Sequence, residues 1–204
     1  MRAQESRISV AVVETLEHYP NEVWEIRLTH LDMFTEEVLD ELDTIAWCEG
    51  NHYPNHSSIS AKTGKHNWGA SGSFADILME VSSNTGGGIG AVAITAAIKS
   101  VYEKFKKRSQ GGAWQSMPSA EEAVSHAKSS LYQHYNVAFD SLTVVRSDAD
   151  AESLRHDFEF SHSDGRKFGA TVGAIKGIPS CIRVWAEGDD LMPRPDPTPP
   201  DPGN

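Results

Sequence analysis

The sequence predicts an α+β fold in which a largely antiparallel sheet packs against a central helical segment. Two observations support this class. Apolar residues alternate with period two near the N-terminus and again over residues 141–187, while the stretch between them shows helical periodicity. The sheet would consist of an N-terminal hairpin and a C-terminal meander of four strands. The sequence leaves open whether these two groups share one sheet.

Residues 7–31 have the pattern of a β-hairpin. Apolar and polar residues alternate over residues 8–12 and again over residues 24–28. Between these runs, Pro20 and Asn21 belong to the residue types that favour turns. A helix over residues 35–47 is expected to follow, with acids in its first turn and on its solvent side.

The central segment from Ser71 to Arg108 contains the longest apolar run and the highest density of glycine. Ser73 and Asp76 have the spacing of a capping box, and the apolar residues after them predict a first helix that ends before Gly86. A second helix is expected from about Ile89 to about Arg108. The simplest interpretation is a pair of core helices that pack closely at their glycine joint.

Two other functions have partial support in this segment. Residues 88–93 match a G-x-G-x-x-A dinucleotide fingerprint, but this motif needs a strand before it and a parallel strand after its helix. Residues 86–97 carry no charge, yet they are too few to span a bilayer. A helix lying on a membrane surface would use an apolar stripe and a basic end, formed by Ile94, Ile98, Val101, Phe105, Lys104, Lys106, Lys107 and Arg108.

Residues 48–70 contain a candidate metal site. Cys48, His52 and His56 recur at four-residue intervals, and His66 follows ten residues later. Cysteine and histidine are zinc ligands, but loop-forming residues separate these four and their spacing matches no zinc-finger pattern. Exposed loop histidines are the simpler interpretation. A short strand is predicted over residues 58–62.

The C-terminal half opens with the clearest helix start in the chain, a capping box formed by Ser119 and Glu122. The helix should end near Asn136. Strands are predicted at residues 142–145, 154–162, 168–174 and 182–186, with a hairpin turn at Asp164–Gly165. Carboxylates two residues apart could hold a cation, although an outer sheet face with alternating charges explains them equally well; they are Asp148 with Asp150 and Asp157 with Glu159.

Composition bounds the remaining possibilities. The chain of 204 residues is predicted to form one domain over residues 1–191, followed by a disordered, proline-rich tail over residues 192–204. This acidic protein has a net charge of −11, which argues against nonspecific binding to nucleic acid. Two cysteines and the absence of an apolar leader favour the cytoplasm.

The leading functional hypothesis is a non-enzymatic cytoplasmic module for protein–protein interaction or regulation. Its partner would be another protein or a second copy of the chain, and no catalytic residue or cofactor is predicted. The first alternative is a membrane-active protein that uses the glycine-rich amphipathic segment 86–108. The second alternative is a metal-dependent enzyme that binds zinc through Cys48, His52, His56 and His66.

Overall fold

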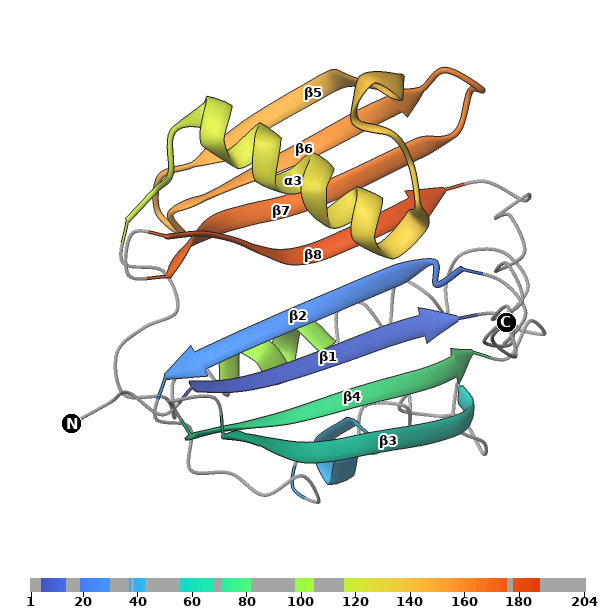
Figure 1. The fold of residues 1–204 in the computed structure, drawn as a ribbon, viewed down its shortest axis with the longest axis vertical. Helices are drawn as coiled ribbons and strands as arrows, with labels where there is room; N and C mark the ends of the chain where they lie inside the picture. Colours follow the sequence, from blue (N-terminus) through green and yellow to red (C-terminus); the bar gives the residue numbers. More distant parts are fainter. Residues whose placement is uncertain are drawn as a thin grey trace, which may run out of the picture.

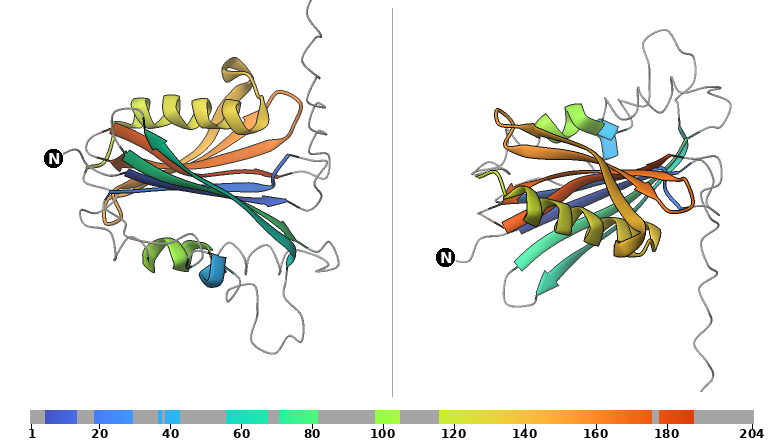
Figure 2. Two further views of the ribbon diagram at one scale, coloured as in Figure 1. Left: turned by 60° about the horizontal axis from the view of Figure 1, so that its bottom comes forward. Right: turned by 90° about the horizontal axis from the view of Figure 1, so that it is seen from above.

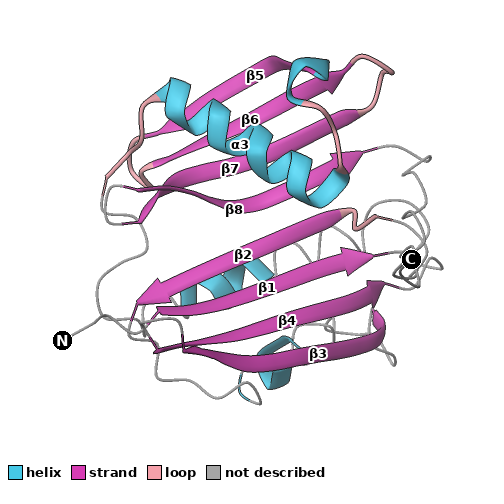
Figure 3. Ribbon diagram, viewed as in Figure 1, coloured by secondary structure: helices cyan, strands magenta, loops and turns pink. Residues whose placement is uncertain are grey.

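The computed structural model describes residues 5–13, 19–29, 37, 39–42, 56–67, 71–81, 98–104, 116–175 and 178–187. Their strands form one eight-stranded sheet with the order β3-β4-β1-β2-β8-β7-β6-β5 (Figure 1). The α+β class is confirmed, and the two groups of strands belong to a single sheet. Strands make up most of the described part of the chain, as Figure 3 shows.

The elements follow one another in two halves. The N-terminal half contains β1 (Glu5–Val13), β2 (Glu22–Thr29), β3 (His56–Asn67) and β4 (Ser71–Val81). The C-terminal half contains α3 (Ala120–Tyr135), the 3₁₀ turn η1 (Phe139–Ser141), β5 (Leu142–Asp150), β6 (Arg155–His162), β7 (Lys167–Ile175) and β8 (Ile178–Glu187). Residues 37, 39–42 and 98–104 are also helical. All neighbouring strands are antiparallel except β1 and β4, which are parallel.

The N-terminal hairpin agrees with its sequence pattern. β1 and β2 pair with Ile8 opposite Ile26 and Val10 opposite Trp24. The backbone N–H of Asn21 donates to the carbonyl oxygen of Val12 at 2.9 Å. The alternating apolar residues therefore predicted both strands.

The helix predicted after Ser73 is wrong, because these residues form the strand β4. Ser73 and Asp76 lie opposite Ser6 and Ser9 of β1, so they do not cap a helix. β4 pairs with β1 on one side and with β3 on the other. In the run Ile77–Leu78–Met79, apolar and polar residues do not alternate. The periodicity of such a run does not distinguish a strand from a helix.

Two further predictions for the central region are confirmed in part. The strand predicted at 58–62 runs from His56 to Asn67 and forms an antiparallel pair with β4. Part of the second predicted helix is confirmed, since residues 98–104 are helical. The glycine joint, like the tail over residues 192–204, lies outside the described residues.

The C-terminal half begins where the sequence predicted. The Ser119 side chain accepts a hydrogen bond from the backbone N–H of Glu122, and the Glu122 carboxylate accepts from the backbone N–H of Ser119. This capping box holds the Glu122 pKa below its ordinary value, first through the Ser119 side chain and then through its backbone. Asn136 ends α3 in the left-handed conformation with φ 54°.

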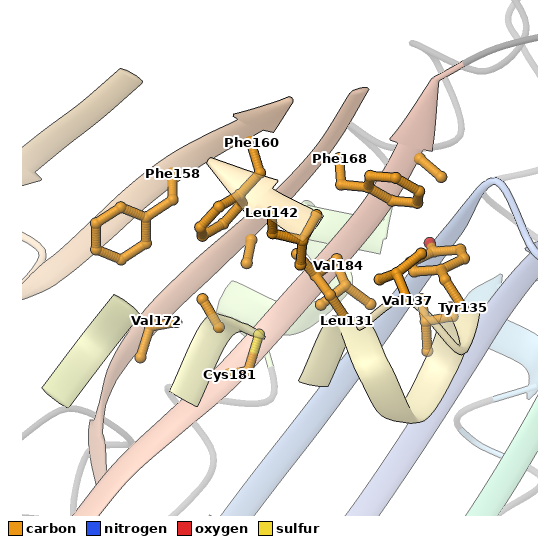
Figure 4. Close-up of a cluster of buried hydrophobic side chains, with 14 of the residues drawn as sticks. Leu131, Tyr135, Val137, Leu142, Phe158, Phe160, Phe168, Val172, Cys181 and Val184 are labelled. Carbon is orange, nitrogen blue, oxygen red and sulfur yellow. The ribbon is translucent and has the colours of Figure 1, made fainter. Parts of the chain in front are cut away.

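The main core of the C-terminal half lies between α3 and the meander (Figure 4). Alternate residues of β6 and β7 face α3 and are fully buried there, including Phe158, Phe160 and Phe168. The predicted turn between these strands is confirmed: Gly165 has φ +94°, and the His162 N–H donates to the Arg166 carbonyl oxygen at 2.9 Å.

The helices cover opposite faces of the sheet. α3 packs on β7 and β8, whereas helical residues 98–104 lie on the other side, against the N-terminal half (Figure 2). Ile98, Val101 and Tyr102 are buried there. The face of β5–β8 that points away from α3 is therefore the place where exposed polar side chains gather.

Candidate functional site

The outer face of β5–β8 carries two rows of polar and aromatic side chains that run across the strands. In one row Asp148, Asp157, Thr171 and Arg183 lie opposite one another on successive strands. In the neighbouring row Arg146, Glu159, Gly169 and Trp185 do the same. Because side chains of a strand alternate between faces, the apolar core on the α3 side places these residues together on the other side.

The indole of Trp185 lies across the backbone of β7 at Gly169. A Cβ atom at position 169 would come within 2.1 Å of Cε2 of Trp185, closer than atoms pack. Glycine is therefore required at this place for the ring to lie flat on the sheet. The half-buried indole forms an apolar platform among the charged side chains.

The outermost arginine joins β5 to β6. Nη2 of Arg146 lies 2.7 Å from the Asp148 carboxylate, and Nη1 lies 3.3 Å from that of Glu159. These three side chains are among the more exposed of the face, so their ion pairs contribute little to stability. They are free to exchange partners at small cost.

A second arginine, on β6, is less exposed than Arg146. Nε of Arg155 is 3.5 Å from the Asp157 carboxylate and 3.9 Å from that of Asp150, which is close enough for ion pairing but not for a hydrogen bond. The Thr171 hydroxyl also donates to Asp157. Asp150 has a lowered pKa, mainly because it accepts hydrogen bonds from the Ser153 side chain and backbone, and so it stays ionised.

The third arginine lies on β8, where the two halves of the sheet meet. Arg183 on β8 pairs with the buried Glu22 of β2, and its guanidinium lies over the Trp24 ring with 5.4 Å to the centroid. This arrangement combines a partly desolvated ion pair with a cation–π contact. Arg183 is consequently the best anchored of the three arginines.

Together these side chains line an open groove of about 460 Å³. Its charged residues are Arg146, Arg155, Arg183, Asp148, Asp157 and Glu159, and Trp185 provides its main aromatic surface. The groove thus holds equal numbers of arginines and carboxylates. We call it the charged groove.

The carboxylates in question were the pairs that the sequence left open as a cation site. The structure places an arginine beside each of them, so protein cations already occupy their surroundings. Within the described ranges, no group of three histidine, cysteine or acidic side chains has the geometry of a metal site.

Two of the four residues of the candidate zinc site fall in the described part of the chain. His56 begins β3 and His66 lies near its end. Ten residues of strand separate them by about 30 Å, whereas ligands of one zinc ion lie within about 4 Å of each other. The structure therefore does not bring these two histidines together, and Cys48 and His52 lie outside the described residues.

The candidate membrane surface is only partly described. Ile98 and Val101 are buried inside the fold, and Lys104 pairs with Glu41. Ile94, Phe105, Lys106, Lys107 and Arg108 lie outside the described residues. No helix within the described ranges combines the length and apolar character that a membrane span requires.

One argument against a dinucleotide site was that the residues before the glycines were predicted to be helical. This argument is wrong, because the strand β4 precedes the glycines. Its two neighbours in the sheet are β1 and β3, which both come earlier in the chain. A parallel strand that follows the motif and lies next to β4, as a dinucleotide fold requires, is absent from the described sheet. The fingerprint residues themselves are not described.

The sequence did not indicate Arg146, Gly169, Arg183 or Trp185 as site residues. One indication was present: Gly169 lies inside a predicted strand, and glycine inside a strand often marks a close approach to its backbone. The arginines offered no such indication, because their convergence depends on the register of four strands.

Comparison of the chain with protein-family models, with curated proteins and with solved structures found no match. The function is therefore inferred from the geometry of the described residues.

Proposed function

We propose that this chain is a non-enzymatic protein-binding module and that its charged groove binds a basic, extended segment of another protein. The observation that supports this proposal is that the carboxylates of the groove are more exposed than two of its three arginines. Asp148, Asp157 and Glu159 keep 57%, 45% and 43% of their side chains exposed. Arg155 and Arg183 keep only 23% and 29%. Acids therefore outnumber bases at the open surface, in agreement with the net charge of −11.

A basic side chain can enter this surface by exchange. Arg146 is the most exposed residue of the groove and holds both Asp148 and Glu159 through weakly stabilising surface pairs. A lysine or arginine of the partner would take over one of these carboxylates and leave the other with Arg146. The ion pairs of the less exposed Arg155 and Arg183 would remain in place.

Trp185 supplies the apolar part of the binding surface. Tryptophan and arginine are enriched at the centres of protein interfaces. The indole lies flat over Gly169, so its face can support the aliphatic stem of a long basic side chain or attract its charge.

A carboxylate beside the groove, Asp150, is poorly suited to proton transfer. A general acid or base works best with a pKa near the operating pH. Next to the groove, the Asp150 pKa is shifted in the opposite direction by its hydrogen bonds from Ser153. Every arginine of the groove has a carboxylate partner, which suits a recognition surface.

The proposal differs in location from the sequence hypothesis. From the sequence, the interaction surface would be the helical segment 86–108 or the proline-rich tail. The described apolar residues Ile98 and Val101 of that segment are buried, and the tail lies outside the described residues. The interaction is therefore assigned to the outer face of β5–β8.

The test uses a short peptide in which lysine alternates with threonine, and its counterpart in which glutamate replaces lysine. We expect the lysine peptide to shift the amide resonances of the outer face and the indole N–H of Trp185, and the glutamate peptide to leave them unchanged. Asp148→Asn combined with Glu159→Gln should abolish these shifts. Trp185→Ala should weaken binding without changing its preference for lysine.

A matched control keeps the same net charge change on the other side of the sheet. Glu121→Gln combined with Asp140→Asn removes two exposed acids on α3 and η1, away from the groove. This variant should bind the lysine peptide like the wild type. Equal loss of binding in both double variants, or shifts outside β5–β8, would contradict the proposal.

A further inference from the structure

The strand β5 forms an open edge of the sheet. It is last in the strand order and has β6 as its one neighbour within the described sheet. Seven consecutive residues, 143–149, are exposed. A strand with an unpaired edge presents free backbone N–H and C=O groups, which form a ready template for another strand.

The exposed apolar side chains gather at the same edge. Among the described residues, the large hydrophobic side chains that are exposed are Tyr132, Phe139, Val144 and Val145. Val144 and Val145 belong to β5, and Phe139 lies just before it in η1. The Phe139 ring contacts Tyr132 of α3, with 6.0 Å between centroids. Exposed apolar groups that gather in one place mark an interaction site.

The turn that carries Phe139 is held firmly. Nζ of Lys128 donates to the carbonyl oxygens of Phe139 and Leu142, at 3.1 and 2.7 Å. The aromatic pair is therefore fixed beside the start of β5.

The charges of β5 are complementary to those of a second copy of itself. When two such strands pair antiparallel about a twofold axis at Ser147, Arg146 of each lies opposite Asp148 of the other. The same register places Val145 opposite Ala149. Residues directly opposite each other share a face of the sheet, so both ion pairs form on the outer face.

We propose that two copies of this chain associate through β5 in this register and form one continuous sheet. The twofold axis is perpendicular to the sheet, so both charged grooves open on the same side. Arg146 and Asp148 of the second copy then lie at the rim of the groove that ends at β5. The association uses Arg146 and Asp148, which also line the charged groove.

Charged side chains on edge strands commonly prevent such pairing, and β5 also has a register shift between Val144 and Arg146. Protection by charge works when the charges repel a second copy. Here Arg146 and Asp148 attract their counterparts, and the register shift lies outside the central residues 146–148. The pattern therefore favours pairing of two copies.

The first experiment exchanges the two charges. Sedimentation of the full chain is measured at about 0.15 M salt, where screening over about 8 Å reduces the repulsion between two acidic molecules. The wild type should dimerise with increasing concentration. Arg146→Asp and Asp148→Arg should each weaken the dimer at least tenfold, because each variant places like charges opposite each other. The double exchange should restore it.

Mixing the two single variants provides the decisive control. Arg146→Asp carries two acids and Asp148→Arg carries two arginines, so the proposed register pairs them with full complementarity. A heterodimer should form from two proteins that do not self-associate. The ion pair between Arg146 and Asp148 within one chain cannot produce this result. Circular dichroism should show that each variant is folded.

The second experiment tests the register. Ser147→Cys, in a Cys48→Ser background, should form a disulfide between copies under mild oxidation. Opposite residues have Cα atoms about 4.5–5.5 Å apart, within the range a disulfide can bridge. Ala149→Cys should not crosslink, since the two cysteines would lie about 13 Å apart along the strands. A wild type that stays monomeric at high concentration, or equal crosslinking at both positions, would overturn the proposal.

Discussion

The two halves of the sheet differ in how directly their sequences predicted their structure. In the C-terminal half, β6 has Phe158 and Phe160 in the core and Asp157 and Glu159 on the outer face. In the N-terminal half, β4 lies between two strands, and its apolar residues follow one another without alternation. Alternation therefore identifies a strand when its two faces meet different surroundings, whereas a continuous apolar run does not distinguish a strand from a helix.

The two halves of the sheet are joined by a shorter strand pairing than the one between β7 and β8. β7 and β8 pair over nine residue positions, whereas β2 and β8 pair over three. The short junction is supported by side chains: Arg183 contacts Glu22 and Trp24, and the Tyr135 hydroxyl lies 3.5 Å from the Asn21 carbonyl oxygen. Burial and then Glu22 raise the Tyr135 pKa well above its ordinary value, so the phenol remains protonated and can donate.

The largest effect is expected in the core of the C-terminal half. Phe160→Ala removes a fully buried ring and should lower the free energy of unfolding by about 3–5 kcal/mol. Chemical denaturation would measure it. A single transition that moves as a whole shows that the halves unfold together. A second transition that stays in place would show that the N-terminal half is independently stable.

The next effect tests the junction. Glu22→Ala leaves the partly buried Arg183 without its carboxylate. Breaking a fully buried pair costs about 3–5 kcal/mol, and the exposure of Arg183 reduces the expected loss to about 2 kcal/mol. Lys167→Ala removes an exposed ion pair with Glu187 and should change stability by less than about 1 kcal/mol. Similar losses in both variants would show that the junction pair has no special role.

A smaller effect is expected at the start of α3. Ser119→Ala removes the hydrogen bond to the Glu122 N–H and should cost about 1 kcal/mol. Ser119→Asp keeps an acceptor at this position and should retain most of the stability. Midpoints of urea denaturation compare the three proteins. Equal stability of the alanine variant would mean that packing alone determines where α3 begins.

The smallest effect concerns the turn between β6 and β7, and it depends on pH. Partial burial opposes ionisation of Asp164, but hydrogen bonds from the Arg166 N–H, from His162 and from the Arg166 side chain outweigh it and lower its pKa to about 2. A lowered pKa in the folded state contributes stability above the ordinary value of 3.8, and this contribution disappears as the pH falls to about 2.

The variant Asp164→Asn separates the charge from the turn, because asparagine still accepts from the Arg166 N–H. It should be slightly less stable than the wild type at pH 7 and equally stable near pH 2. Thermal midpoints measured across this range provide the comparison. A stability difference that does not change with pH would assign the effect to turn geometry instead of charge.

Sequence alone determined the elements whose signals are local. The capping box at Ser119 began α3, the Asp164–Gly165 turn joined two alternating strands, and the N-terminal hairpin followed from its period of two. Each of these signals comes from a short, continuous stretch of the chain. Their backbone preferences act before any tertiary contact forms.

Only the tertiary structure decided the strand β4, the union of both halves in one sheet and the charged groove. β4 became a strand because β1 and β3 pair with its two edges. Arg146, Arg183 and Trp185 converge because the registers of β5–β8 add up across the sheet. A register depends on which strands become neighbours, and residues far apart in the chain determine that choice through the burial of their apolar faces.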